Sequence, residues 1–170
     1  MTERISVLLV HLDGPHMAPL EASLEDQPVV ILRAQTCLEA AKILAGPEPP
    51  HLVFVDAALP DGSWADVIAL SKNASVPVNV IIVARLVDTR FYVEVIEAGA
   101  YDFIAPPFRS SDLHHVLRCA LQNVLERREA RVRTEHAAQR QLFPSGLPPG
   151  SPNLPAARPI AGVRTAHKPL

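Results

Sequence analysis

The chain has 170 residues and a formal net charge of −2, and apolar residues make up 48% of it. This length suits one domain of about 100–150 residues with an appended segment, and the apolar content excludes a chain that is disordered throughout. No apolar run is long enough to span a membrane. Residues 5–10 are too short for a signal-peptide core, so we expect a cytoplasmic protein without a membrane partner.

Charge is distributed unevenly along the chain. Residues 126–170 hold eight basic and three acidic residues, and the remainder carries a net charge of −7. A basic end can indicate an anionic partner such as nucleic acid. Here the basic residues are interrupted and lack interleaved aromatic residues, which favours a solvated helix face and a disordered end over nucleic-acid binding.

Strand and helix patterns alternate five times along the chain. Strands are predicted over 5–10, 29–32, 51–56, 78–84 and 101–105. Helices are predicted over 15–26, 36–45, from 63 onward, over 87–98 and from Ser110 or Ser111 onward. Thr36 with Glu39 forms a capping-box pattern, and Gly99 is a good residue to follow a helix end. This alternation predicts an α/β fold: a doubly wound, flavodoxin-like (βα)₅ parallel sheet of order 2-1-3-4-5.

A single carboxylate, Asp56, ends the apolar third strand and precedes a turn that contains Pro60 and Gly62. In an open parallel sheet, the carboxyl ends of the strands near the reversal of strand order form the usual site. A carboxylate in this place either accepts backbone N–H groups from the following turn or acts chemically. There is no phosphate-binding glycine motif and no nucleophile set at the strand ends, so a conventional enzyme is not expected.

Two segments resemble the receiver domains of response regulators. They are Leu52–Ser63 (LVFVDAALPDGS) and Glu97–Phe108 (EAGAYDFIAPPF), and spacing and element order agree over roughly residues 4–125. The resemblance implies a role in phosphorelay signal transduction, with Asp56 at the phospho-acceptor position and Phe103 as the aromatic switch residue. It also implies a histidine kinase or phosphotransfer protein and a downstream effector as partners, and a homodimer face on the fourth helix, fifth strand and fifth helix.

The chain departs from this family at the other polar positions of the site. The adjacent acidic pair that holds Mg²⁺ in the family falls on His11 and Leu12, with Asp13 one position too late. The hydroxyl residue falls on Val83 and the lysine on Pro106. Asp13 and Asp56 are the carboxylates that remain as candidate Mg²⁺ ligands, and two carboxylates make a poor ligand set.

These losses weaken phosphoryl chemistry, because a phosphoryl group adds roughly −1.5 to −2 charge. An opposite unit charge 4 Å away is worth about 4 kcal/mol at an effective dielectric constant of 20. We therefore expect phosphorylation of Asp56 by the usual route to be slow and its product to be poorly stabilised.

Other side chains are candidate substitutes for the missing cations. His11, when protonated, could pair with Asp56, although a strand-end histidine bonded to its neighbours is the favoured interpretation. Arg85 could turn inward or remain solvated. The remaining polar candidates are interpreted as surface histidines (His16, His114, His115), as turn or helix-start residues (Asp61, Asp66) and as reduced thiols (Cys37, Cys119).

The last helix has an apolar face up to Leu125 and a polar sequence after Glu126. We predict a receiver-like domain over 1–125, a polar helical extension over 126–143 and a Pro-rich disordered tail over 144–170. A sustained coiled-coil heptad is absent. Two functions remain open: a stand-alone response regulator that receives phosphate on Asp56, and a phosphorylation-independent pseudo-receiver that acts as a protein-docking module. The second is favoured.

Overall fold

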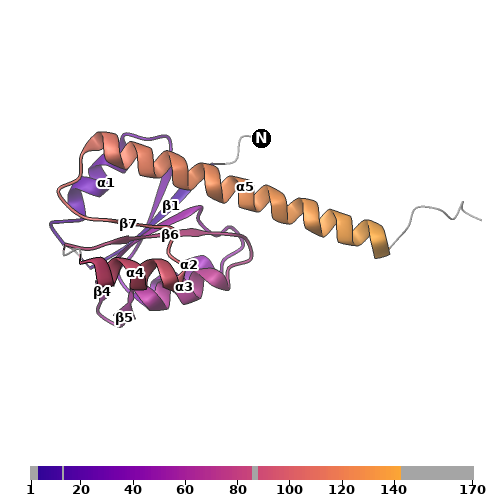
Figure 1. The fold of residues 1–170 in the computed structure, drawn as a ribbon, viewed down its shortest axis with the longest axis horizontal. Coiled ribbons are helices and arrows are strands. Elements are labelled where there is room, and N and C mark those ends of the chain that lie inside the picture. The colour runs from indigo at the N-terminus through magenta and orange to yellow at the C-terminus, as the bar shows by residue number, and fades with distance from the viewer. Residues whose placement is uncertain (1–3, 13, 86–87, 143–170) are drawn as a thin grey trace, which may run out of the picture.

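Five parallel strands form one sheet in the order β2-β1-β3-β6-β7 (Figure 1). The computed structural model describes residues 4–12, 14–85 and 88–142. The strands are β1 (Ser6–Val10), β2 (Val30–Ala34), β3 (Leu52–Asp56), β6 (Asn79–Val83) and β7 (Asp102–Ile104). Since β6 and β7 are the fourth and fifth strands of this sheet, the predicted flavodoxin-like order is confirmed.

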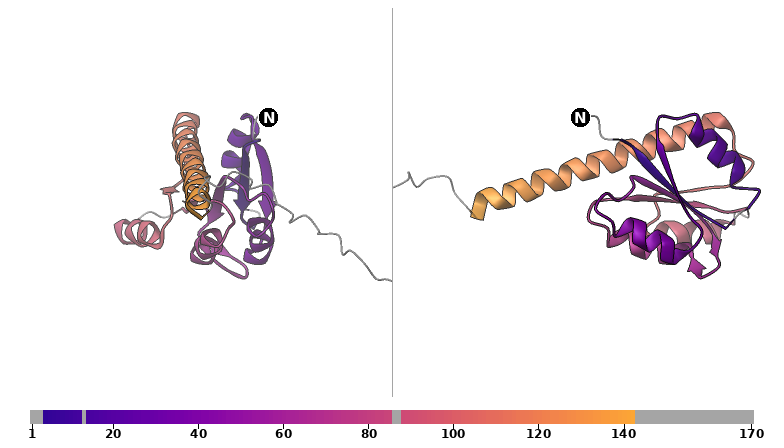
Figure 2. Two further views of the ribbon diagram at one scale, coloured as in Figure 1. Left: turned by 90° about the vertical axis from the view of Figure 1, so that its right-hand side faces the viewer. Right: turned by 180° about the vertical axis from the view of Figure 1, so that it is seen from behind.

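Helices cover both faces of the sheet, as parallel strands with crossover helices require. On one face lie α1 (Ala18–Glu25) and α5 (Ser110–Leu142), and on the other lie α2 (Cys37–Leu44), α3 (Trp64–Lys72) and α4 (Thr89–Ala98) (Figures 1 and 2). Each face has its own buried apolar cluster. The sheet is therefore apolar on both sides, which explains why its strands are continuous hydrophobic runs in the sequence.

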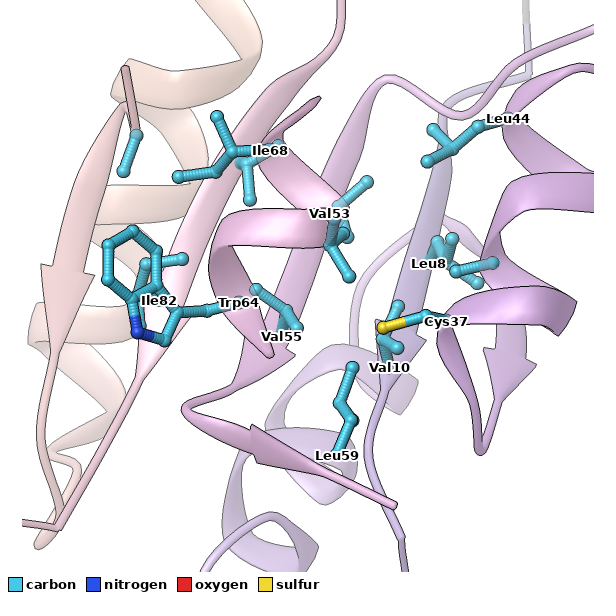
Figure 3. Close-up of a cluster of buried hydrophobic side chains, with 14 of the residues drawn as sticks. Leu8, Val10, Cys37, Leu44, Val53, Val55, Leu59, Trp64, Ile68 and Ile82 are labelled. Carbon is cyan, nitrogen blue, oxygen red and sulfur yellow. The ribbon is translucent and has the colours of Figure 1, made fainter. Parts of the chain in front are cut away.

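The two-residue period of the strands decides which cluster each side chain joins. In β3, Val53 and Val55 point toward α2 and α3 together with Leu8 and Ile82 (Figure 3). The alternate residues Leu52 and Phe54 belong to the cluster under α1 and α5. Asp56 continues this alternate set and therefore emerges on the side of the sheet that α1 covers.

Helix ends largely follow the predicted capping chemistry. The Thr36 side chain accepts a hydrogen bond from the backbone N–H of Glu39 at 3.1 Å, and the Glu39 carboxylate accepts from the backbone N–H of Gln35. Ser63 and Asp66 form a capping box at the start of α3. Gly99 ends α4 with φ of 104°, a left-handed conformation in which a Cβ atom is strained.

Two local predictions differ from the structure. Helix α1 begins at Ala18 rather than at Pro15, and Pro19 occupies its first turn. A short hairpin of β4 (Ala58–Leu59) and β5 (Gly62–Ser63) follows β3. Two-residue strands are too short to show any hydrophobic period, so no sequence pattern indicated this hairpin.

Helix α5 continues as one helix well past the predicted boundary at residue 125 and projects from the body (Figures 1 and 2). Arg127 donates to the Asn79 side chain at 2.6 Å. Arg128 donates to the carbonyls of Pro49, Pro50 and Pro77. Both arginines therefore pack on the body, whereas residues 131–140 are exposed. The tail predicted over 144–170 lies outside the described residues.

No helix in the described part of the chain combines the length and the apolar character that crossing a bilayer requires.

Candidate functional site

The end of β3 holds the acidic side chain around which the site is built. The Asp56 side chain is 17% exposed. It opens into a shallow pocket of about 520 Å³ lined by His16, Asp56, Ala57, Ala58, Ala84, Arg85, Asp88 and Phe91. Because β3 and β6 pair in parallel, the pocket collects residues that follow both strands. Its polar groups are three charged side chains and one histidine.

His16 is the side chain that contacts Asp56. Its Nε2 atom lies 2.8 Å from Oδ2 of Asp56, an ion-pair distance without hydrogen-bond geometry, and its side chain is only 9% exposed. The interpretation of His16 as a surface residue is therefore wrong. His16 lies just before α1, which covers the face of the sheet on which Asp56 emerges, so its ring reaches the carboxylate from that side.

Gly14 makes room for the His16 ring. A Cβ atom at residue 14 would lie 2.7 Å from Cε1 and 2.9 Å from Nδ1 of His16, closer than real Cβ contacts allow. Proximity of a glycine to a histidine in sequence carries no recognisable signal by itself, which is why this contact was not predicted.

Arg85 completes a chain of three side chains. Its Nε and a terminal guanidinium nitrogen lie 3.3 and 3.1 Å from Nδ1 of His16. An arginine only donates hydrogen bonds, so Nδ1 is the acceptor and the proton of a neutral His16 ring is assigned to Nε2, facing Asp56. Arg85 turns toward His16 in the structure and remains exposed to solvent, so it combines features of the two alternatives.

Neither His11 nor Leu12, at the end of β1, forms a hydrogen bond or ion pair with Asp56. The His11 backbone N–H donates to the Ala34 carbonyl, and its Nδ1 atom is buried without a partner among the described residues. Thus His16, not His11, is the histidine that contacts Asp56. Leu12 is 53% exposed and has no polar side-chain atom. Asp13 lies outside the described residues.

Two further positions lack the polar groups that the receiver resemblance implies. Val83 is fully buried in the cluster under α1 and α5, and the neighbouring Ala84 lines the pocket instead. The strand-end position facing the site is therefore Ala84 rather than Val83, and it too has no hydroxyl. Pro106, at the lysine position, has no charge and no backbone donor.

The described residues do not fit Mg²⁺. They include no group of three histidine, cysteine or acidic side chains arranged to hold a metal ion. Leu12 offers no oxygen ligand, and the nearer oxygen of Asp56 faces the His16 ring. Hard divalent cations need several oxygen ligands, so the side chains around Asp56 do not supply a magnesium site.

An aromatic series connects the pocket to the predicted switch residue. The Phe91 ring, which lines the pocket, packs edge-on against Phe103 with centroids 5.7 Å apart. Trp64 and Tyr92 extend the series, at 5.8 Å from Phe91 and 6.4 Å from Phe103. The side chain of Phe103 is thus held by α4 rather than left free.

Two titrating groups lie in and beside the hairpin that follows β3. The Asp61 carboxylate accepts hydrogen bonds from the backbone N–H groups of Cys37 and Leu38, and these bonds hold its pKa below the usual value. Burial, followed by the charges of Asp61 and Asp66, raises the pKa of the Cys37 thiol. Asp61 is therefore a cap for α2, and Asp66 is a helix-start residue as predicted.

The sheet order agrees with comparisons to known proteins. The family model described as the response regulator receiver domain matches residues 7–118. The chain belongs to this receiver-domain family. Receiver domains are signalling modules of two-component systems that interact with histidine kinases and with effectors.

Similar proteins share the domain rather than the whole chain. The KDP operon transcriptional regulatory protein KdpE of Escherichia coli (strain K12) is 30% identical over 118 residues, which are 69% of this chain and 51% of that protein. The chain thus spans about half the length of this curated relative.

Solved receiver domains have the same fold. A signal receiver domain of an HD domain-containing protein from Pseudomonas fluorescens Pf-5 aligns with a TM-score of 0.68 and 25% identity, covering 76% of this chain and 95% of that one. A CheY-like receiver domain protein from Methanospirillum hungatei JF-1 aligns with a TM-score of 0.62 and 23% identity, covering 73% and 98%.

Proposed function

We propose that this receiver domain signals by docking to a protein partner, without Mg²⁺-dependent phosphoryl transfer to Asp56. The observation that carries this proposal is the contact of 2.8 Å between Asp56 and His16, whose other ring nitrogen accepts from Arg85. The acceptor oxygen is already engaged by a neighbouring side chain. A phosphoryl group placed there would have to displace this contact.

The absence of suitable charge at the other positions supports the same conclusion. Phosphoryl transfer depends on positioning and on stabilising the charge of the transferring group. Leu12, Ala84 and Pro106 contribute no cation, no metal ligand and no side-chain donor to the pocket. Among the described residues that line the pocket, only His16 and Arg85 can supply such charge, and they are bonded to one another.

The surface best suited to docking is the exposed side of α4. Among the residues of this helix, only Val95 is buried. Tyr92, Val93 and Ile96 expose 45%, 44% and 36% of their surface. Partly exposed apolar side chains beside an ordered aromatic series form a contact surface whose shape is set in advance, which lowers the entropic cost of binding.

Intact-mass measurement after incubation with a small acyl phosphate and Mg²⁺ tests the phosphate-independent part of the proposal. We expect no phosphoryl adduct on the wild-type chain at any Mg²⁺ concentration. An adduct that disappears in Asp56→Asn would instead support the other candidate, a phospho-accepting response regulator. A receiver domain with an intact acidic pair, hydroxyl and lysine serves as the positive control for the donor.

A variant that carries the family's site residues provides the opposite test. His11→Asp, Leu12→Asp, Ala84→Thr and Pro106→Lys return the family's groups to the site, and His16→Met, added to them, frees Asp56. We expect this variant to gain the adduct. If neither chain is modified while the positive control is, the defect lies outside the four restored positions, and the missing groups do not explain it.

To test docking, the full-length chain is immobilised and the partner proteins that it retains are measured. Retention should be unchanged in Asp56→Asn and by addition of the acyl phosphate. It should be lost in the double variant Tyr92→Ser, Ile96→Ser, while the exposed control Arg133→Ala behaves as wild type. Loss of retention in Asp56→Asn with full retention in the α4 variant would contradict the proposal.

A further inference from the structure

We propose that a cavity at the base of the domain, where the strands of the sheet begin, binds a small molecule that carries a phosphate group. The cavity has a volume of about 450 Å³, within the usual range of roughly 300–1,000 Å³ for small-molecule sites. Its lining comes from the end of α3, the turn after α4, the start of β6, and α5 where that helix leaves the body (Figure 1). Asn79 begins β6, whereas Asp56 ends the neighbouring β3, so the cavity is separate from the pocket at Asp56. The proposal does not depend on the docking function.

The cavity is lined by positive charge. Lys72 on α3 and Arg127 and Arg131 on α5 line it, and no acidic side chain is among its lining residues. Arg131 pairs with Glu135 at 2.9 Å, which offsets part of its charge. Among the described residues, neither Lys72 nor Arg127 forms an ion pair with a carboxylate. This concentration of cations is notable because the chain up to residue 125 carries a net charge of −7.

Lys72 is held in place and still has donors to offer. Its Nζ atom donates to the Ala98 carbonyl at the end of α4, at 2.8 Å. Gly99 leaves space for this side chain, because a Cβ atom there would lie 3.2 Å from Cε and 3.4 Å from Nζ of Lys72. An ammonium group has three N–H bonds and this contact uses one of them. The others can bond an anion in the cavity.

Arg127 is fixed by a buried amide. A terminal nitrogen of its guanidinium donates to Oδ1 of Asn79 at 2.6 Å, and Asn79 is only 2% exposed. The Asn79 amide nitrogen donates in turn to the Ala120 carbonyl and to the Asn123 side chain, which fixes the orientation of the amide. A guanidinium has five N–H bonds, and most of those of Arg127 remain for a ligand. Because these cations are positioned in advance, binding costs little further ordering of side chains.

Phosphate suits these donors better than a single carboxylate does. A phosphate monoester carries roughly −1.5 to −2 charge near neutral pH, which matches more than one cation. The planar fork of an arginine fits phosphate oxygens, and a lysine adds a point charge beside it. Apolar side chains, among them Val76 and Val78, also line the cavity and suit the organic part of a phosphate ester.

The test is an NMR titration of the full-length, isotopically labelled chain with inorganic phosphate and, separately, with adenosine 5′-monophosphate. Both are run at constant pH and ionic strength, because salt screens exposed charges. We expect at least one probe to cause saturable changes in the Arg127 Nε–H, the Asn79 side-chain amide and the Gly99 amide. Tighter binding of the nucleotide assigns the site to a phosphate ester, and equal binding assigns it to the phosphate group alone. Adenosine, which lacks the phosphate, should leave these signals unchanged.

Two variants show which cations are responsible. Lys72→Gln removes the charge but keeps an amide N–H for the Ala98 carbonyl, and it should raise the dissociation constant about tenfold, the factor that one hydrogen bond to a charged group supplies. Arg118→Gln removes an exposed cation of the same helix that does not line the cavity, and it should bind as the wild type does.

The proposal is overturned if neither phosphate nor the nucleotide causes saturable changes at the cavity, or if adenosine causes the same changes. It is also overturned if Lys72→Gln binds as tightly as the wild type, or if Arg118→Gln weakens binding equally. The comparison of the probes on the wild-type chain requires no variant, so it decides the question even if Lys72→Gln fails to fold.

Discussion

Polar side chains bridge distant elements at both ends of the sheet, and the two clusters are built differently. At the base, Asn79 is 2% exposed and joins β6 to α5 through Ala120, Asn123 and Arg127. At the site, Asp56, His16 and Arg85 join β3 to the segments before α1 and after β6. The base cluster has an uncharged amide at its centre, whereas the site cluster has a titratable ring between opposite charges.

This difference separates an uncharged cluster from a charged one. A neutral amide with its donors and acceptor satisfied holds one arrangement at every ordinary pH. The site cluster instead joins a carboxylate, a histidine and a guanidinium. We therefore expect the base cluster to contribute more to stability than the site cluster.

Asn79→Ala should produce the largest loss of stability. Removing the buried amide takes away its hydrogen bonds to the Ala120 carbonyl, Asn123 and Arg127. The free energy of unfolding should therefore fall by about 2–3 kcal/mol. Urea denaturation measures this. Asp56→Asn should change it by less than about 1 kcal/mol, and the exposed control Arg133→Ala by less than about 0.5 kcal/mol. An equal loss for Asn79→Ala and Asp56→Asn would remove the distinction between the two clusters.

Two glycine substitutions sharpen the same distinction. Gly99→Ala should cost about 1–2 kcal/mol, because φ is 104° there. In Gly14→Ala the new Cβ would lie closest to the His16 ring, at 2.7 Å from Cε1, with the Leu12 carbonyl next at 3.4 Å. Stability should change less, while the NMR signals of the His16 ring should report loss of the Asp56 contact. If Gly14→Ala leaves those signals unchanged, the position assigned to the ring is wrong.

The acid limb of the stability curve should depend on Asp61. Hydrogen bonds from Cys37 and Leu38 lower its pKa in the folded state, so its contribution to stability is present above its ordinary value of 3.8 and is lost as pH falls through the lowered folded value. In acid denaturation, Asp61→Asn should make the free energy of unfolding depend less steeply on pH at low pH. Asp26→Asn, an exposed control, should not.

The two thiols should differ in reactivity, which is the smallest effect predicted. Burial and nearby carboxylates raise the pKa of the Cys37 thiol, so little thiolate forms at pH 8. Cys119 is only partly buried and lies beside His115. Mass spectrometry after thiol alkylation should show Cys119 modified first, and faster modification of Cys37 would contradict the packing around α2.

The fold was predictable because its strands are apolar throughout and its helix ends carry strong capping signals. Thr36, Ser63 and Gly99 are examples, and each acts through neighbours within a few residues. The role of Asp61 as a cap for α2 was not predictable, because its partners Cys37 and Leu38 lie more than twenty residues away in sequence.

The candidate site was predictable only in part. The position of Asp56 follows from strand order. Spacing placed the hydroxyl position one residue early, on the buried Val83, whereas Ala84 lines the pocket. The contact with His16 depends on how the chain turns between β1 and α1 and on the space left by Gly14. An ungapped comparison with the family directs attention to His11, which is nearer the strand end but does not contact Asp56.

The most direct test of phosphate-independent signalling is the mass of the intact chain after exposure to an acyl phosphate and Mg²⁺, measured beside the restored variant. We predict no adduct on the wild type and one phosphoryl group on the variant. A wild-type adduct that maps to Asp56 would show that His16 and Arg85 permit transfer, and the docking-only function would be wrong.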